Sequence, residues 1–190
     1  MITFEELIRN QFEYGGKKYA LSGSETREST DDLFDDFGKS WLFGTMGKYI
    51  KRYRNLRLEK DILKIGCYSY ITWLKRGFFV DEKRVIPLDT NLEVKKIYFD
   101  EFVYRFNKFS NGYEKHSKKI IEKIALDDNN FLNLVYELLV QLTNKDWKET
   151  TEDNLFVIFY SMKHIWNENF SQLTEHKTDT GNTNEKLGTI

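Results

Sequence analysis

Only one proline, Pro87, occurs in this chain of 190 residues, and its scarcity is the strongest constraint on the fold. Proline interrupts a helix because it has no backbone N–H and its ring clashes with the preceding turn. A chain nearly free of proline can therefore form long helices. Apolar residues recur at helical spacing through most of the sequence. These features predict an all-α protein, a bundle of about six or seven helices.

The densest apolar pattern predicts two consecutive helices, at residues 31–54 and 58–77. The first carries a continuous apolar stripe, and the second ends at Gly77 after two basic residues. Because the turn between them is short, we expect the two helices to pack antiparallel. The bundle is expected to be built around this pair.

Three glycines, Gly38, Gly44 and Gly47, interrupt the apolar stripe of the first helix of the pair. Each glycine costs about 1 kcal/mol of helix stability relative to alanine. Three in one helix suggest that something approaches the backbone closely. A neighbouring helix is one interpretation, and a ligand ring or phosphate is the other.

The remaining helices are bounded by glycines, asparagines and capping residues. The first is expected to end at Gly15-Gly16, and one in the second half at Asn111-Gly112, before a basic helix at 113–126. The run 131–142 is apolar on nearly all sides, so we expect it to be buried between neighbours. Residues 78–89 have some strand character, which Pro87 limits to an edge or a loop.

The length of the chain suits one helical domain, expected at residues 1–172. Within it, residues 1–79 are expected to form a ligand-bearing layer, with residues 91–172 packing behind it. Residues 173–190 contain almost no apolar side chains and are expected to be a disordered tail.

Composition narrows the classes of protein further. A net charge of −1 argues against a chain that binds nucleic acid over its whole surface. The one cysteine, Cys67, is expected to be a small buried apolar residue, and it cannot form an intrachain disulfide. The N-terminus does not resemble a signal peptide, and no uncharged run approaches the roughly 20 residues that span a bilayer. We therefore expect a soluble, cytoplasmic protein that does not enter membranes.

Acidic residues gather at the start of the first helix of the pair. Asp32 and Asp36 share one helical face, with Asp35 beside them. Carboxylates that converge in this way suit Mg²⁺, which takes one or two of them together with phosphate oxygens and water. The alternative is a solvated helix start whose acids favour the helix dipole.

Basic residues gather near the end of the same helix, without an acid among them. Lys48 and Arg52 share a face, and Lys51 and Arg54 lie beside them. Arginine offers a fork that matches phosphate oxygens, and lysine acts as a point charge. Tyr53 alternates with them and could stack on a base. The alternative is a solubilising helix end.

Other familiar sites are not indicated. The three histidines are scattered without metal-ligand spacing, and there is no P-loop, dinucleotide-binding glycine motif or hydrolase nucleophile motif.

Three segments carry a resemblance to a known family: GGKKY at 15–19, GKYIKRY at 47–53 and EKDILKIGCYSYITWL at 59–74. Their order resembles the dATP/dGTP diphosphohydrolase-type helical domain of phage and bacterial proteins, similar in style to the all-α pyrophosphohydrolases of the MazG kind. The likeness covers roughly residues 11–78. The paired E-x-x-E and E-x-x-D motifs of the MazG kind are absent, and Asp32-x-x-Asp35 and Glu59-x-Asp61 are the nearest candidates.

The resemblance implies binding, and Mg²⁺-dependent hydrolysis to monophosphate and pyrophosphate, of a purine nucleoside triphosphate. The expected roles follow the chemistry of the residues. The expected catalytic residues, which hold Mg²⁺ and orient water, are Asp32, Asp35, Asp36 and Asp61, of which Asp32, Asp36 and Asp61 are the expected metal ligands. The expected nucleotide-binding residues are Lys17, Lys18, Lys48 and Arg52 at the phosphates and Tyr19 or Tyr53 at the base.

Two functions from other classes remain open. One is a regulatory protein that binds a partner through its aromatic surface. The other is a nucleic-acid binder that uses the basic residues at 48–57 and the lysines at 115–123. The sequence also leaves the oligomeric state open, with a homo-oligomer among the alternatives.

Overall fold

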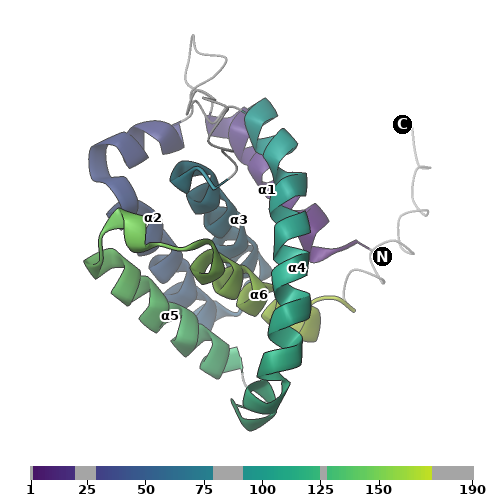
Figure 1. Cartoon of the computed structure of the whole chain (residues 1–190). Coiled ribbons are helices and arrows are strands. Elements are labelled where there is room, and N and C mark those ends of the chain that lie inside the picture. Colours follow the sequence, from purple (N-terminus) through teal and green to yellow (C-terminus); the bar gives the residue numbers. More distant parts are fainter. Residues whose placement is uncertain (1, 20–28, 79–91, 125–127, 173–190) are drawn as a thin grey trace, which may run out of the picture.

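The computed structural model describes residues 2–19, 29–78, 92–124 and 128–172, and within these ranges the chain is all-α, with no strand (Figure 1). Side chains at 15–19, 29–31, 92–94 and 113–124 are not described. The described residues form six α-helices and one 3-10 helix: α1 (Phe4–Tyr19), α2 (Ser29–Leu56), α3 (Glu59–Arg76), α4 (Leu92–Ile124), α5 (Asp128–Asn144), η1 (Trp147–Glu149) and α6 (Glu152–Asn169). The predicted fold class and number of helices are confirmed. The segment with strand character and the C-terminal tail lie almost wholly outside the described residues, and the division of residues 1–172 into two layers stays a prediction.

The capping residues explain where the helices begin and end. Thr3 Oγ1 accepts a hydrogen bond from the backbone N–H of Glu6 at 3.2 Å, and the Glu6 carboxylate accepts one from the N–H of Thr3 at 2.7 Å. Thr151 and Asn154 form the same reciprocal pair at the start of α6. At the end of α3, Gly77 adopts a left-handed conformation with φ of 72° and donates its N–H to the carbonyl of Leu74.

Two predicted helix ends are wrong. α1 continues through Gly15-Gly16 to Tyr19, and α4 continues through Asn111-Gly112 to Ile124, so that two predicted helices form one. Glycine and asparagine lower helix stability, but they do not block the helix sterically as proline does. Each helix can therefore continue through these residues when the rest of the helix is stabilised by packing.

The predicted antiparallel pair is confirmed as α2 and α3, which pack together across a turn at Arg57 and Leu58. Near the turn, Arg52 bonds Asp61; far from it, the Lys75 ammonium lies 5.3 Å from the ring centre of Phe34. The contacts run in opposite sequence order along the two helices, as an antiparallel pair requires.

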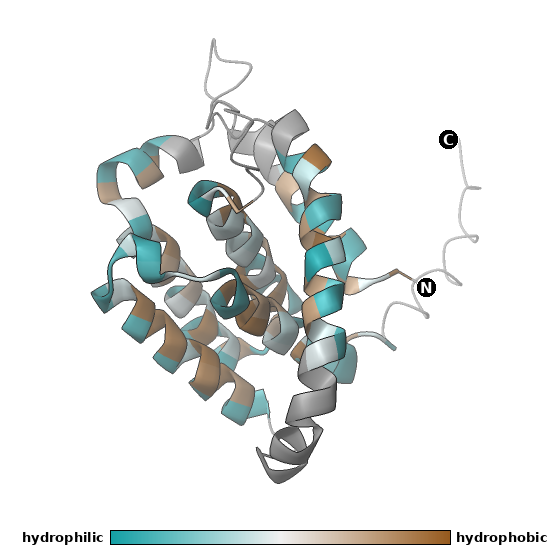
Figure 2. Cartoon of the chain, viewed as in Figure 1, coloured by the Kyte–Doolittle hydropathy of each residue, from teal (hydrophilic) through white to brown (hydrophobic). Residues whose placement is uncertain are grey.

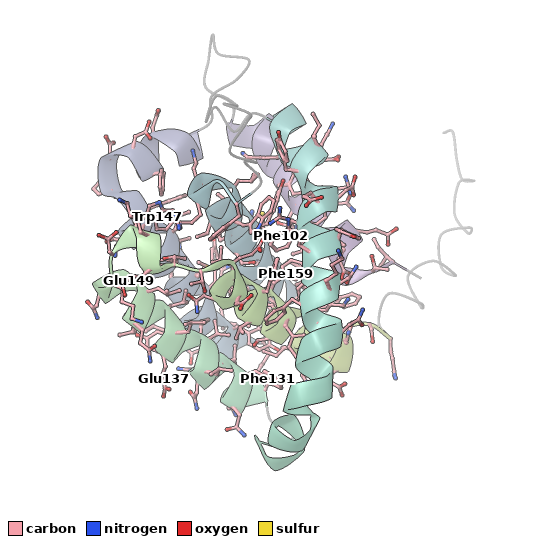
Figure 3. The ribbon with its side chains drawn as sticks, viewed as in Figure 1. Phe102, Phe131, Glu137, Trp147, Glu149 and Phe159 are labelled. Atoms are coloured by element: carbon pink, nitrogen blue, oxygen red, sulfur yellow. The ribbon has the colours of Figure 1, made fainter. Side chains whose placement is uncertain are left out.

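α3 is the central helix. It packs against α1, α2, α4 and α6, and most of its residues are buried. The core beside it is aromatic: Phe102 of α4 and Phe159 of α6 lie toward each other with ring centres 5.0 Å apart (Figure 3). Cys67 of α3 is buried, as expected. No helix in the described ranges has the length and apolar character to cross a bilayer.

The run 131–142 was expected to be buried between neighbours, and this holds for one face of α5 only, where Phe131, Leu132, Val135, Leu139 and Leu142 are buried. The helix lies at the edge of the bundle beside α2, and apolar residues are visible along it (Figures 1 and 2). Leu134 is 41% exposed and Val140 is 47% exposed. The apolar character of this helix therefore extends onto the protein surface.

Candidate ligand-binding groove

Two residues predicted to act on different parts of a ligand bind each other. The guanidinium of Arg52 donates from Nε to both carboxylate oxygens of Asp61, at 2.7 and 2.9 Å, and a second nitrogen also contacts the carboxylate. Asp61 is fully buried, whereas the Arg52 side chain is 37% exposed. The hydrogen bond from Asp61 raises the pKa of the Arg52 guanidinium above its usual value. The pair therefore joins the end of α2 to the start of α3.

The predicted metal ligands are not brought together. Asp32, Asp35 and Asp36 lie in the first turns of α2, and Asp61 lies beside Arg52 near its other end. The part of α2 from Gly38 to Arg52 spans about 21 Å at the usual rise of 1.5 Å per residue, and the three aspartates lie before it. Among the described residues, no group of three or more His, Cys, Asp or Glu side chains lies close enough to hold a metal ion.

The basic run divides into residues that the fold uses and residues that face solvent. Arg54 donates to Asn133 at 2.6 Å, and Arg57 pairs with Asp128 at 3.2 Å. Lys48 and Lys51 are exposed, and neither forms an ion pair within the described part of the chain. Arg52 and Arg57 are therefore paired with carboxylates, whereas Lys48, Lys51 and Arg54 keep charges that no acid among the described residues compensates.

Tyr53, one candidate for stacking on a base, belongs to the core. Its ring is buried, the Arg57 guanidinium lies 5.2 Å from the ring centre, and burial raises the pKa of its hydroxyl. It offers no open face to a ligand in this structure. Lys17, Lys18 and Tyr19 lie at the end of α1, but their side chains are outside the described residues, so their roles stay predictions.

Lys48 and Lys51 border a groove of about 460 Å³ between α2 and α5. This volume is within the range of pockets that hold small molecules. From α2 and α5 the groove is lined by Phe43, Gly44, Gly47, Lys48, Lys51, Tyr136, Leu139, Val140 and Thr143. Buried Phe43 and Leu139 make it apolar at the base, while the two lysines make its α2 side positive.

The glycines of α2 leave this groove open. A Cβ atom on Gly44 would meet none of the described atoms within 4 Å, and one on Gly47 would meet only Tyr136, at an ordinary 3.7 Å. The interpretation that a neighbouring helix packs closely against Gly44 is therefore wrong. The tightly packed glycine is Gly66 of α3, where a Cβ would lie 2.9 Å from side-chain atoms of Phe4 and Ile8.

Gly38 has a different role, since it kinks α2. Its φ of 57° and ψ of −147° interrupt the helix, and a residue with a side chain rarely adopts this conformation. Residues 29–37, before the kink, therefore take a different direction from the rest of α2 (Figure 1).

Tyr136 completes the α5 wall of the groove and was not identified from the sequence. The Lys51 ammonium and the Arg54 guanidinium each lie 5.6 Å from the centre of its ring. No local pattern marks this tyrosine, because its importance comes from a helix that lies far away in the sequence.

Comparisons of the chain with protein-family models, with curated proteins and with solved structures find no match. The geometry of the groove and the chemistry of its residues are therefore the basis for a functional proposal.

Proposed function

We propose that the protein binds a ligand with an aromatic ring and one or more phosphates in the groove between α2 and α5, with a purine nucleoside triphosphate as the leading candidate. The observation that carries the proposal is the position of Lys48 and Lys51. Two lysines that have no acidic partner among the described residues border a groove whose wall is a partly exposed tyrosine and whose glycines leave space beside the helix backbone.

The two sides of the groove suit the two parts of such a ligand. Lys48 and Lys51 lie three residues apart on one helical face, so a phosphate group can contact both ammonium groups. A planar ring would lie against the open surface at Gly44 and the exposed side chain of Val140. The ring of Tyr136 adds an aromatic face within the same groove.

Other features favour a small ligand over a long nucleic acid. Arg57 is paired with Asp128, and Arg52 with Asp61, so the basic run offers less free charge than its sequence suggests. The expectation from the sequence that GKYIKRY, residues 47–53, resembles part of the dATP/dGTP diphosphohydrolase-type domain agrees with a nucleotide, because this segment contains Gly47 and Lys48. The proposal concerns nucleotide binding and not hydrolysis, because the carboxylate of Asp61, an expected metal ligand, is paired with Arg52.

Isothermal titration calorimetry tests this proposal. ATP, dATP, GTP, dGTP, the corresponding monophosphates and pyrophosphate would be titrated into the protein with and without Mg²⁺. Charge-assisted contacts contribute about 1.5–3 kcal/mol each, so Lys48→Ala and Lys51→Ala should each weaken binding about tenfold to hundredfold. The triphosphates should bind more tightly than the monophosphates, because they offer more oxygens to the lysines.

Two further variants test whether binding depends on the groove or only on the positive charge of the protein surface. Gly44→Leu should block binding without unfolding the protein, because its side chain would occupy open space in the groove. Lys60→Ala is the matched control, since Lys60 is an exposed lysine on α3 outside the groove, and it should bind like the parent. Binding that survives Gly44→Leu, or no binding by the parent at millimolar nucleotide, would contradict the proposal.

A further inference from the structure

The segment of α2 before the kink, residues 29–37, has a surface opposite in charge to the groove; we call this segment the arm. Its sequence contains four acids, Asp31, Asp32, Asp35 and Asp36, of which the last two are exposed. Phe37 follows directly after these acids, and it is 63% exposed, although phenylalanine is usually buried. The arm thus combines negative charge with an accessible aromatic ring.

The arm is fixed to the rest of the fold by one of its faces. The ring of Phe34 lies 5.7 Å from that of Trp147, and the Lys75 ammonium lies 5.3 Å from the centre of the Phe34 ring. Phe37, three residues further along, remains on the surface. The structure therefore holds the arm in place while it presents Phe37 to the outside.

The arm leaves the groove of its own chain open. None of the described residues of the arm lines the groove, and Phe37 lies on the surface before the kink, about two helical turns before Gly44. The groove is therefore accessible to the arm of another molecule.

We propose that the groove receives the arm of a second copy of this chain, and that two copies form a symmetric dimer in which each arm occupies the other's groove. Phe37 would enter beside Gly44 and Val140, where the structure leaves open space and apolar surface. The carboxylate of Asp36, next to Phe37, would then lie against Lys48 and Lys51. A twofold arrangement repeats this contact, so both grooves are occupied.

This contact also regulates the proposed site, because the arm and a phosphate-bearing ligand compete for the same lysines. That competition rests on the proposed function, whereas dimer formation does not. Nucleotide is therefore expected to shift the protein toward the monomer. The dimer is measured first without nucleotide, so the two proposals can fail separately.

Sedimentation velocity of the full chain over a wide range of protein concentrations tests the dimer. The parent should show a concentration-dependent monomer–dimer equilibrium that weakens as salt is added. Phe37→Ala, and separately the double variant Lys48→Glu/Lys51→Glu, should weaken the dimer about tenfold or more. Lys108→Glu is the matched control, since this exposed lysine on α4 lies over the ring of Tyr104 and outside the groove.

A mixing experiment gives the decisive result. Asp36→Lys reverses the charge beside Phe37, and Lys48→Glu/Lys51→Glu reverses the charge in the groove, so each variant should dimerise more weakly by itself than the parent. Mixed together, they should form a heterodimer, because in both contacts position 36 again faces groove side chains of opposite charge. A parent that stays monomeric at every concentration, or a dimer that is unaffected by these variants, would overturn the inference. So would the absence of the heterodimer while circular dichroism shows both variants to be folded.

Discussion

The guanidinium of Arg52 and the carboxylate of Asp61 form a forked ion pair across the turn between α2 and α3. Asp61 has no exposed surface, so its charge depends on Arg52 for compensation, whereas Arg52 is partly exposed to water. This asymmetry makes the two residues unequal in their contribution to stability. From the sequence alone, Arg52 was expected to bind the phosphates of a nucleotide.

Arg52→Ala should destabilise the fold by about 2–4 kcal/mol, because it leaves a buried carboxylate without its partner. Asp61→Ala should cost less, since the freed guanidinium can turn into solvent. The free energy of unfolding of both variants can be measured by urea denaturation. Arg54→Ala, which removes an exposed contact to Asn133, is the control and should cost less than about 1 kcal/mol.

Replacing both residues of the ion pair distinguishes the cost of an unpaired buried charge from the cost of lost packing. The double variant Arg52→Met/Asp61→Leu should recover much of the stability lost in Arg52→Ala, because no charge remains unpaired. If Arg52→Ala is as stable as the parent, the ion pair contributes nothing and the assignment of Arg52 to the fold is wrong.

The fold class could be predicted because apolar periodicity and the lack of proline act locally along each helix. The position of Asp61 could also have been anticipated: in an antiparallel pair, the start of the second helix lies beside the end of the first. That geometry separates Asp61 from Asp32 and Asp36, so the predicted metal set conflicts with the predicted helix pair. Tyr136 could not be predicted, because helix periodicity does not reveal which helices become neighbours.

The glycines provide a second prediction, in which two substitutions change the free energy of unfolding in opposite directions. Gly44→Ala should stabilise the protein by about 0.5–1 kcal/mol, because alanine favours the helix and its methyl group meets open space. Gly66→Ala should destabilise it by about 1–3 kcal/mol, because the ring of Phe4 would have to move. That ring is held between Phe159 and Trp166.

Thermal and urea denaturation of the two glycine variants, measured beside the parent, give the comparison. Two stabilised variants would mean that Phe4 moves at little cost. A destabilised Gly44→Ala would show that the groove is closed in solution, and that would count against the proposed site as well.

A third prediction concerns alkaline pH and the buried hydroxyl of Tyr70, which donates to the backbone carbonyl of Lys95. Burial raises the pKa of this hydroxyl above its ordinary value of 10.0. Above pH 10 the unfolded chain therefore releases the proton while the folded protein retains it. The folded state then binds more protons than the unfolded state, and stability falls as pH rises.

Tyr70→Phe removes this proton and should make the loss of stability above pH 10 shallower than in the parent. At neutral pH the same variant should cost about 1 kcal/mol, the usual contribution of one hydrogen bond. Urea denaturation at pH values on both sides of 10 measures both effects. Equal slopes for the two proteins would show that Tyr70 ionises as readily in the folded state as in the unfolded one.

Nuclear magnetic resonance tests the central claim most directly, because it reports where a nucleotide contacts the folded protein. Amide resonances of ¹⁵N-labelled protein would be followed while dGTP or ATP is added. The account predicts progressive shifts at Gly44 and Gly47 in the groove and none at Gly66, which lies beneath Phe4 and Ile8 in the core. If the amide resonances of Gly44 and Gly47 do not move at millimolar nucleotide, the proposal that the groove binds a nucleotide is contradicted.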